Sequence, residues 1–290
     1  MTSPNVPPPA FPDRAAPGLR RRGEIDVLGW PAFAGHALDA VVTSRHGGVS
    51  QGPYQSLNLG LHVGDDAGAV LANRRRAAAA LGAGLEDMVF CNQSHDKNVH
   101  VVTGADRGRG TRGQDDAIAA TDALVTAEPG VVLVVMVADC VPIVLFDPVA
   151  HVLACVHAGW RGTVARVSEA AVQAMTALGS DPGDIIAGIG PAISPDAYQV
   201  GQDVAAAAAA CFGERGASAV IRPDGAGKWL FDLWRANRVI LGEAGVREDN
   251  THLAAVPTGP AGGGLFFSDR QARPCGRFAA IARLHPRAGE

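Results

Sequence analysis

Residues 123–158 read ALVTAEPGVVLVVMVADCVPIVLFDPVAHVLACVHA, and this stretch decides the fold class. It contains four runs rich in β-branched residues, separated by turn residues: Ala123–Thr126, Val131–Val137, Val141–Phe146 and Val152–Val156. The runs are apolar throughout and do not alternate with polar residues, which is typical of strands buried on both faces. The sequence therefore predicts buried central strands at the middle of a layered fold.

Outward from this centre, the pattern predicts further strands and several helices. The predicted helices are 67–81, a helix after GWRG with apolar residues at 164, 167, 171, 175 and 178, the alanine-rich 204–211, and 233–241 capped by Asp232. The further predicted strands are 40–44, 88–92, 98–103, 184–189, 264–268 and 277–284. We expect an α+β fold in which mixed β-sheets are flanked by helices. No shift in composition marks a linker, so residues 25–290 are predicted to form one domain.

Residues 1–24 contain six prolines and basic residues but no apolar segment of the kind a signal peptide carries. We expect them to form a disordered arm. The longest apolar run, 131–138, is far too short to span a bilayer.

The whole-chain composition excludes several classes of partner. Of the 290 residues 47% are hydrophobic and 19% charged, and the net charge of −4 provides no electrostatic attraction to nucleic acid or to an anionic membrane. The five cysteines are odd in number and include no CxxC pair, so a disulfide framework is not expected. We predict a soluble, cytoplasmic monomer that acts on small molecules.

Three residues at strand ends are candidate metal ligands: His95 in QSH, Cys140 in ADC and His157 in VHAGWRG. Two imidazoles and one thiolate suit zinc and leave a fourth position open, as in a catalytic site. However, 44 residues separate His95 from Cys140 and 16 separate Cys140 from His157, which matches no zinc spacing pattern. On spacing alone, a buried hydrophobic Cys140 and two hydrogen-bonded structural histidines are the better explanation of the pattern. Asp139 favours a site, because an acid at the end of an apolar strand is costly without a partner.

Longer motifs resemble a known family. In order along the chain they are TSRHGGVSQGPYQSLNLGLHVGDD, QSH, DALVTAEPGVVLVVMVADCVPIVLFDP, VHAGWRGTVA, GIGPAISPDAYQVG, and FFSDR with GRFAA. They resemble the YfiH/laccase-domain family of purine nucleoside phosphorylases, and the resemblance runs from about residue 40 to residue 284. The ADC and HAGWRGT motifs are its most specific parts.

The resemblance implies a single-domain fold related to the catalytic domain of cytotoxic necrotizing factor, with stacked β-sheets flanked by helices. It also implies zinc bound by His95, Cys140 and His157, which are then the catalytic residues. Members of the family cleave adenosine, inosine, guanosine and methylthioadenosine with phosphate and deaminate adenosine; some bacterial members are linked to peptidoglycan editing. The expected partners are therefore purine nucleosides and phosphate.

The sequence departs from the family pattern in places. Ser94 and Asp96 replace an apolar residue and a glycine beside His95, and Thr251 stands where many members have a cysteine. The double arginine that follows FFS in the family is here Asp269 and Arg270. No departure removes a proposed zinc ligand.

Residues around the proposed metal offer further candidates. Arg45 and Asn58 are predicted to hold the nucleoside or phosphate, because a guanidinium matches phosphate oxygens; the alternative is a solvated loop charge and a turn cap. The turn AGWRGT either binds an anion with its amides or is a tight strand-to-helix turn over Trp160. His62, Asp65 and Asp66 form a polar cluster that could assist proton transfer at a purine nitrogen, whereas turn formation explains Asp65 and Asp66 equally well.

Three other functions remain open at this stage. A Cys140 thiolate activated by His157 is also the pattern of a cysteine hydrolase, for example an amidohydrolase that edits a peptidoglycan precursor. A copper polyphenol oxidase is disfavoured because multicopper chemistry uses HxH pairs, and none of the nine histidines forms one. A binding module stabilised by a metal is the non-enzymatic alternative.

Overall fold

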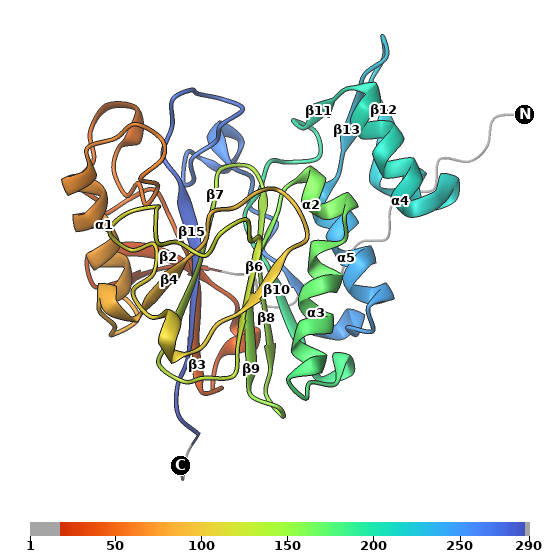
Figure 1. Cartoon of the computed structure of the whole chain (residues 1–290). Coiled ribbons are helices and arrows are strands. Elements are labelled where there is room, and N and C mark those ends of the chain that lie inside the picture. Colours follow the sequence, from red (N-terminus) through yellow and green to blue (C-terminus); the bar gives the residue numbers. More distant parts are fainter. Residues whose placement is uncertain (1–17, 288–290) are drawn as a thin grey trace, which may run out of the picture.

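The computed structural model describes residues 18–287, and its core is two six-stranded sheets stacked face to face (Figure 1). The first sheet has the order β1 (Gly18–Arg22), β2 (Ile25–Gly29), β3 (Leu38–Thr43), β15 (Phe278–Leu284), β7 (Val132–Val137), β4 (Met88–Phe90). The second has the order β14 (Thr251–Leu253), β10 (Ile186–Ile189), β8 (Val141–Asp147), β9 (Val152–Ala158), β6 (Ala123–Thr126), β5 (Val99–Val101). Most pairs are antiparallel, but β4–β7, β5–β6 and β10–β14 are parallel. The predicted mixed α+β fold with stacked sheets is confirmed.

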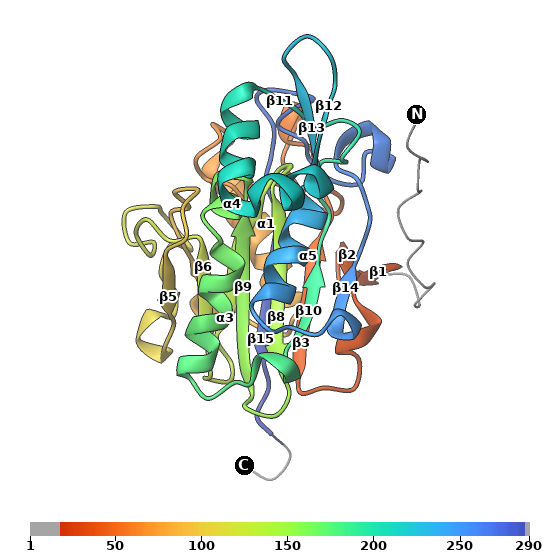
Figure 2. The same ribbon diagram turned by 90° about the vertical axis from the view of Figure 1, so that its right-hand side faces the viewer.

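The strands are apolar throughout because both faces of each sheet are covered. In β7, Leu133 and Val135 lie in the core between the sheets, whereas Val132 and Val134 pack on the side of α1 (Ala67–Ala79). The outer face of the second sheet is covered by α3 (Val167–Ala177) and α5 (Leu233–Glu243), which Figure 2 shows in front of β9, β8 and β10. The strands predicted over 123–158 are confirmed as β6, β7, β8 and β9.

A smaller unit lies at one end of the second sheet. Its three-stranded sheet has the order β11 (Gln199–Val200), β13 (Trp229–Phe231), β12 (Ile221–Pro223). The helix α4 (Gln202–Val220) packs beside it, and its helical geometry is interrupted at Gly213, where φ is 68°. None of the helices in the described chain is long and apolar enough to cross a bilayer.

Three predictions about elements are wrong in part. The helix after GWRG is two helices, α2 (Trp160–Val164) and α3, because Arg166 adopts a left-handed conformation between them. Residues 264–268 form a loop: Gly264 has a φ of 69°, and the following phenylalanines are buried without a strand partner. Residues 18–22 of the predicted disordered arm form β1, which pairs with β2; residues 1–17 lie outside the described chain.

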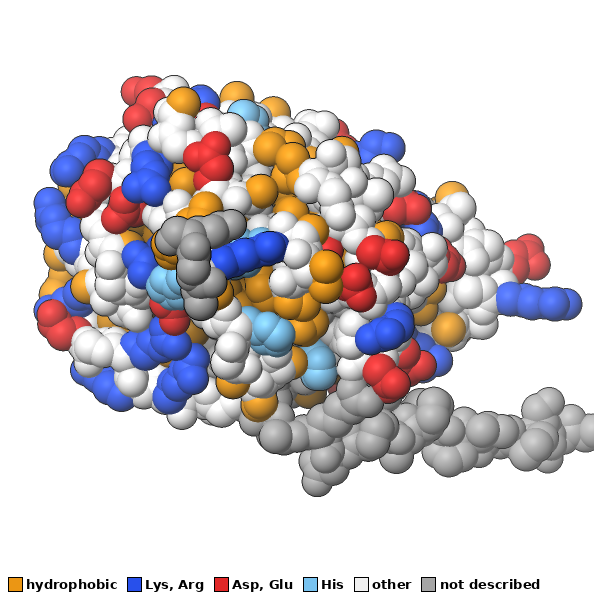
Figure 3. Space-filling view, turned by 90° about the horizontal axis from the view of Figure 1, so that it is seen from below, with side chains coloured by type: hydrophobic (Ala, Val, Ile, Leu, Met, Phe, Trp, Pro, Cys, Tyr) orange, Lys and Arg blue, Asp and Glu red, His pale blue; other side chains and the backbone are white. Residues whose placement is uncertain are grey.

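The pairing of β15 with its two neighbours shows which residues lie at each end of the first sheet. Val137 pairs with Phe278 at one end of the first sheet, and Leu38 pairs with Leu284 at the other. The turn from β7 to β8 crosses from the first sheet to the second at the Val137 end and carries Asp139 and Cys140. Histidine side chains lie among apolar ones on the opposite end, which Figure 3 shows from below.

Candidate metal centre and active site

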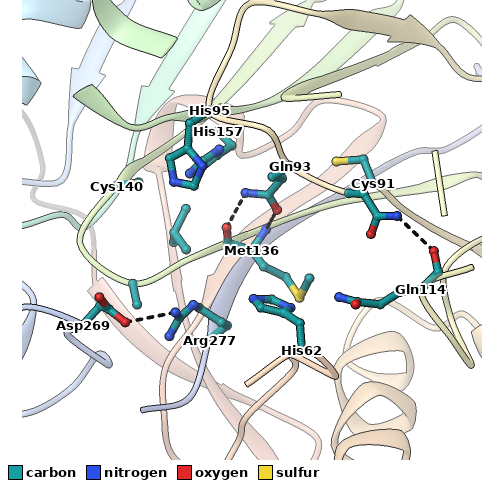
Figure 4. Close-up of a pocket in the computed structure, with 13 residues that line it drawn as sticks. His62, Cys91, Gln93, His95, Gln114, Met136, Cys140, His157, Asp269 and Arg277 are labelled. Carbon is teal, nitrogen blue, oxygen red and sulfur yellow. Dashed lines mark hydrogen bonds and ion pairs between the residues drawn. The ribbon is translucent and has the colours of Figure 1, made fainter. Parts of the chain in front are cut away.

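The three proposed ligands come from different elements and meet at one point. His95 lies in the loop between β4 and β5, Cys140 in the turn between β7 and β8, and His157 in β9. One donor atom from each lies within 4.8 Å of the other two, and the two imidazole rings meet edge to face with centroids 4.7 Å apart (Figure 4). This is the only group of three or more such side chains positioned to hold a metal within residues 18–287.

Asp122, which precedes β6, joins two of these ligands. Its Oδ1 accepts a hydrogen bond from Nδ1 of His157 at 2.8 Å and from the backbone N–H of His95 at 3.0 Å. Its Oδ2 accepts from the backbone N–H groups of Ser94 and Asp96 and from the Ser94 hydroxyl, at 2.9–3.1 Å. The carboxylate therefore orients the His157 ring, leaves Nε2 for a metal, and fixes the loop that carries His95.

The same contacts explain the backbone conformation of His95. Its φ is 61°, in the left-handed region that a non-glycine residue adopts only when its surroundings impose it. Three successive amides that bind one carboxylate supply that constraint. Ser94 and Asp96, which depart from the family pattern, thus contribute through main-chain groups and one hydroxyl.

The turn that carries Cys140 is also held in place. Asp139 has a φ of 88°, and its carboxylate accepts hydrogen bonds from the Thr258 hydroxyl at 2.5 Å and from the backbone N–H of Arg270 at 2.7 Å. The expectation that this acid has a partner is confirmed. The partners lie more than a hundred residues away, so the Cys140 turn depends on the tertiary fold.

Gly159 leaves room for the ligand group. A Cβ atom at this position would lie 2.9 Å from the Cys140 sulfur and 3.0 Å from Cδ2 of His95. Its φ of −71° is accessible to any residue, so space and not conformation demands glycine here. The following helix α2 has only five residues, and Trp160 packs partly in the core, which favours the tight-turn interpretation of AGWRGT.

The titratable side chains of the ligand group shift one another's pKa values. Burial acts to raise the pKa of the Cys140 thiol, but the two neighbouring imidazoles lower it to about 6. Burial acts to lower the pKa of His157, but Cys140 and Asp122 raise it to about 9. The pKa of Asp122 falls to about 2 against the effect of burial, because His157 and the backbone N–H of Asp96 stabilise its charge. The metal-free chain thus favours a thiolate beside a protonated imidazole.

A cavity of about 430 Å³ opens beside the three ligands (Figure 4). One wall is tied together by Gln93, whose side-chain amide exchanges two hydrogen bonds of 2.7 and 2.8 Å with the backbone of Met136. The side chains away from the ligand group are mostly polar: His62, Gln114, Asp269 and Arg277. The cavity therefore offers a metal site at one end and polar groups at the other, a pattern typical of small-molecule sites.

The two predicted substrate-binding residues do not line this cavity. Asn58 is fully buried, and its side-chain amide forms hydrogen bonds within the protein. Its Oδ1 accepts from the backbone N–H groups of Gly60 and Arg277, and its Nδ2 donates to the Asp65 carboxylate and to the Gly60 carbonyl. Arg45 donates two hydrogen bonds to the Gln55 carbonyl at 2.7 and 2.9 Å. The contacts of both residues with substrate stay a prediction, whereas the hydrogen bonds between Asn58 and Gly60 match its alternative role as a turn cap.

His62 and Asp66, which are close in sequence, have different surroundings in the structure. His62 lines the cavity, but Asp66 caps α1 by accepting a hydrogen bond from the Ala69 N–H at 2.8 Å. Sequence reasoning did not single out Asp122 or Arg277. The signal for Asp122 was present, because it too is an acid at the end of a buried apolar strand; Arg277 reaches the cavity only through the fold.

Comparison with known proteins places the chain among relatives of similar length. The family described as "Multi-copper polyphenol oxidoreductase laccase" matches residues 39–285. A Bacillus subtilis protein named purine nucleoside phosphorylase YlmD is 38% identical over 230 residues, covering 79% of this chain and 82% of the relative. A protein from an unknown prokaryotic organism, named adenosine deaminase RL5, is 39% identical and covers 73% of this chain and 81% of the relative.

The fold is shared with a solved structure. The crystal structure of the Bacillus licheniformis hypothetical protein YfiH has a TM-score of 0.86 and 33% sequence identity. The match covers 92% of this chain and 98% of that one.

Proposed function

The chain belongs to the multi-copper polyphenol oxidoreductase laccase family, and we propose that it is a zinc-dependent purine nucleoside phosphorylase. The proposed substrates are adenosine, inosine, guanosine and methylthioadenosine, each cleaved with phosphate, and a second proposed activity is the deamination of adenosine. The observation that carries the proposal is the His95, Cys140 and His157 group on the wall of a cavity large enough for a small molecule. Relatives named for both activities support it.

The donor set fits zinc. Two imidazoles and a thiolate are borderline to soft ligands, and a group of three leaves a coordination position for substrate. Asp122 orients one imidazole, and the missing side chain of Gly159 keeps the group open. Zinc held by these residues would supply a Lewis acid to the cavity.

In phosphorolysis, an oxygen of phosphate forms a bond to C1′ of the ribose while the C1′–N9 bond breaks. The electron pair of that bond leaves with the purine, which takes up a proton from solvent while the phosphate gives one up, so the products are the free base and the 1-phosphate of the sugar. The residues of the chain bind and orient the two reactants: the polar side chains of His62 and Gln114 face the cavity at the end away from the ligands (Figure 4). Holding two reactants together in this way is itself a large source of rate acceleration.

The test is a nucleoside panel incubated with the purified, zinc-loaded protein, with and without phosphate, and analysed by mass. Phosphate-dependent release of free base and ribose phosphate is the expected result, and inosine formed from adenosine without phosphate reports the deaminase activity. Removal of zinc by a chelator should abolish both reactions. Full activity in a sample verified to be metal-free would contradict the proposal.

One observation favours a second candidate, a cysteine-type amidohydrolase that edits a peptidoglycan precursor. The lowered pKa of Cys140, caused by its imidazole neighbours against the effect of burial, is what a nucleophilic thiolate requires. The predicted relation to the catalytic domain of cytotoxic necrotizing factor points in the same direction. Alkylation of Cys140 in metal-free protein distinguishes the candidates, because only the hydrolase is active before and inactive after it. Polyphenol oxidation ranks below both, since the described residues offer one three-ligand group.

A further inference from the structure

The end of the cavity away from the metal ligands carries excess positive charge. Arg277 is the only arginine or lysine that lines the cavity within the described chain, and its side chain is 21% exposed. Its Nη2 contacts Oδ1 of Asp269 at 3.0 Å, while Oδ2 of the same carboxylate binds Arg273 at 2.6 Å. One carboxylate is thus shared between two guanidinium groups.

A second guanidinium lies beneath this end of the cavity. Arg74, in α1, is 1% exposed and donates hydrogen bonds of 2.6–2.9 Å to the carbonyls of Leu59, Gly110 and Thr111. Its Nη2 is 4.0 Å from the sulfur of Met136, a residue of the cavity wall. Within residues 18–287 no carboxylate forms an ion pair with Arg74, and although burial lowers its pKa to about 9, it is charged at neutral pH. The three carbonyls and the Phe90 ring, whose centroid lies 3.8 Å from Cζ of Arg74, stabilise this charge but do not neutralise it, so a bound anion would stabilise the arrangement further.

The two arginines also affect the pKa of His62. Burial, Arg277 and Arg74 all lower the pKa of its imidazole, in that order of size. The ring is therefore neutral at pH 7 and can donate one hydrogen bond to a ligand oxygen. Figure 4 shows His62 and Arg277 at the lower part of the cavity, away from His95 and His157.

We propose that this end of the cavity binds inorganic phosphate, held by Arg277 and His62 above the buried charge of Arg74. The planar guanidinium matches phosphate oxygens, and inorganic phosphate, a mixture of monoanion and dianion at neutral pH, balances the excess positive charge. The nucleoside then occupies the space between the phosphate and the ligand group. The choice of phosphate among oxyanions rests on the proposed function.

Binding of inorganic phosphate to the zinc-loaded protein, measured by calorimetry without nucleoside, tests the proposal. Arg277→Met should weaken binding about tenfold or more, because a charge-assisted contact is lost, and Arg277→Lys should weaken it less. The matched control is Arg107→Met: Arg107 likewise pairs with one aspartate, Asp87, at 2.9 Å, but it does not line the cavity, so the phosphate Kd of this variant should stay within about twofold of the wild-type value. Zinc content and melting temperature verify that each variant is folded.

A second measurement needs no arginine variant. In the wild-type protein, phosphate should raise the pKa of His62, because a nearby anion stabilises the protonated ring. The pKa is measured by an NMR titration, and the His62→Gln variant assigns the resonance. An unchanged phosphate Kd in Arg277→Met, or a His62 resonance that phosphate does not move, overturns the inference. Phosphate binding that depends on Arg277 in a protein that cleaves no nucleoside would instead retain this subsite and refute the proposed function.

Discussion

Asp122 controls more of the candidate site than any other single residue outside the ligands. Its carboxylate accepts hydrogen bonds from the His157 imidazole and from three backbone N–H groups of the loop that carries His95. Asp122→Asn replaces one acceptor oxygen with an NH₂ group that faces these donors. We expect metal affinity to fall about 10- to 100-fold, as for other residues that orient a metal-binding histidine. Competition with a chromophoric chelator measures it.

The matched control for this variant is Asp106→Asn. Asp106 is also a mostly buried aspartate, and its carboxylate likewise binds a backbone N–H, that of Thr103, and a histidine, His100. It has no contact with the ligand group, so its replacement should lower stability and leave metal affinity unchanged. Equal metal affinities for the two variants would show that Asp122 has no special role.

Gly159 provides a test of space at the metal centre. In Gly159→Ala the new methyl group would lie 2.9 Å from the Cys140 sulfur, closer than van der Waals contact allows. Metal affinity should fall at least about tenfold because the ligands must move apart. Gly242→Ala in α5 is the control, since its methyl group meets nothing within 4 Å, and it should stabilise the protein by about 0.5–1 kcal/mol. Normal zinc binding by Gly159→Ala would contradict the assignment.

At the scale of single elements, α5 shows how local and tertiary signals agree. Asp232 accepts a hydrogen bond from the Arg235 N–H at 2.9 Å, as the sequence predicted for an N-cap, and the apolar face of the helix packs in the core over the second sheet. Asp232→Ala should lower the free energy of unfolding by about 1 kcal/mol, measured by urea titration. Asp203→Ala in the first turn of α4 is the control, because Gly201 and not Asp203 occupies that N-cap position. A loss no larger than that of the control would rule out the capping role.

Elements also show where local patterns mislead. The apolar sequence GLFFS at 264–268 has the composition of a strand, yet Gly263 and Gly264 both have positive φ and turn the chain. Phe266 and Phe267 are buried as a loop that packs beside the core, so their hydrophobicity reports burial and not extended pairing.

At the scale of the whole molecule, a cluster of charges joins both ends of the described chain. Asp39 in β3 accepts hydrogen bonds from Arg22 in β1 at 2.5 Å and from His285, just after β15, at 2.8 Å. Burial acts to raise the pKa of Asp39, but these two partners lower it below its ordinary value. The native state therefore binds fewer protons at this site than the unfolded chain, and the stabilisation is lost as the pH falls below about 4.

Asp39→Asn tests this linkage. The free energy of unfolding of the variant should be lower than that of the wild type at pH 7, and the difference should shrink between about pH 5 and pH 3. Asp26→Asn serves as the control, because Asp26 forms an exposed pair with Arg21 and should show little change. A difference between wild type and Asp39→Asn that is independent of pH would exclude the charge linkage.

Much of the fold followed from the sequence alone. The runs over 123–158 are apolar on both faces, so their burial could be predicted without knowing their partners, and the motifs around Cys140 and His157 identified two of the three candidate ligands. The cap at Asp232 acts within a few residues, which is why local reasoning found it.

Only the tertiary structure decided how these parts meet. His95, Cys140 and His157 converge because stacked sheets bring the loop after β4, the β7–β8 turn and β9 to one end of the molecule. The roles of Asp122 and Arg277 depend on partners 26 to 219 positions away, and no local pattern encodes such distances. The sequence thus determined which chemical groups are available, whereas the long-range packing of the two sheets determined which of them share a cavity.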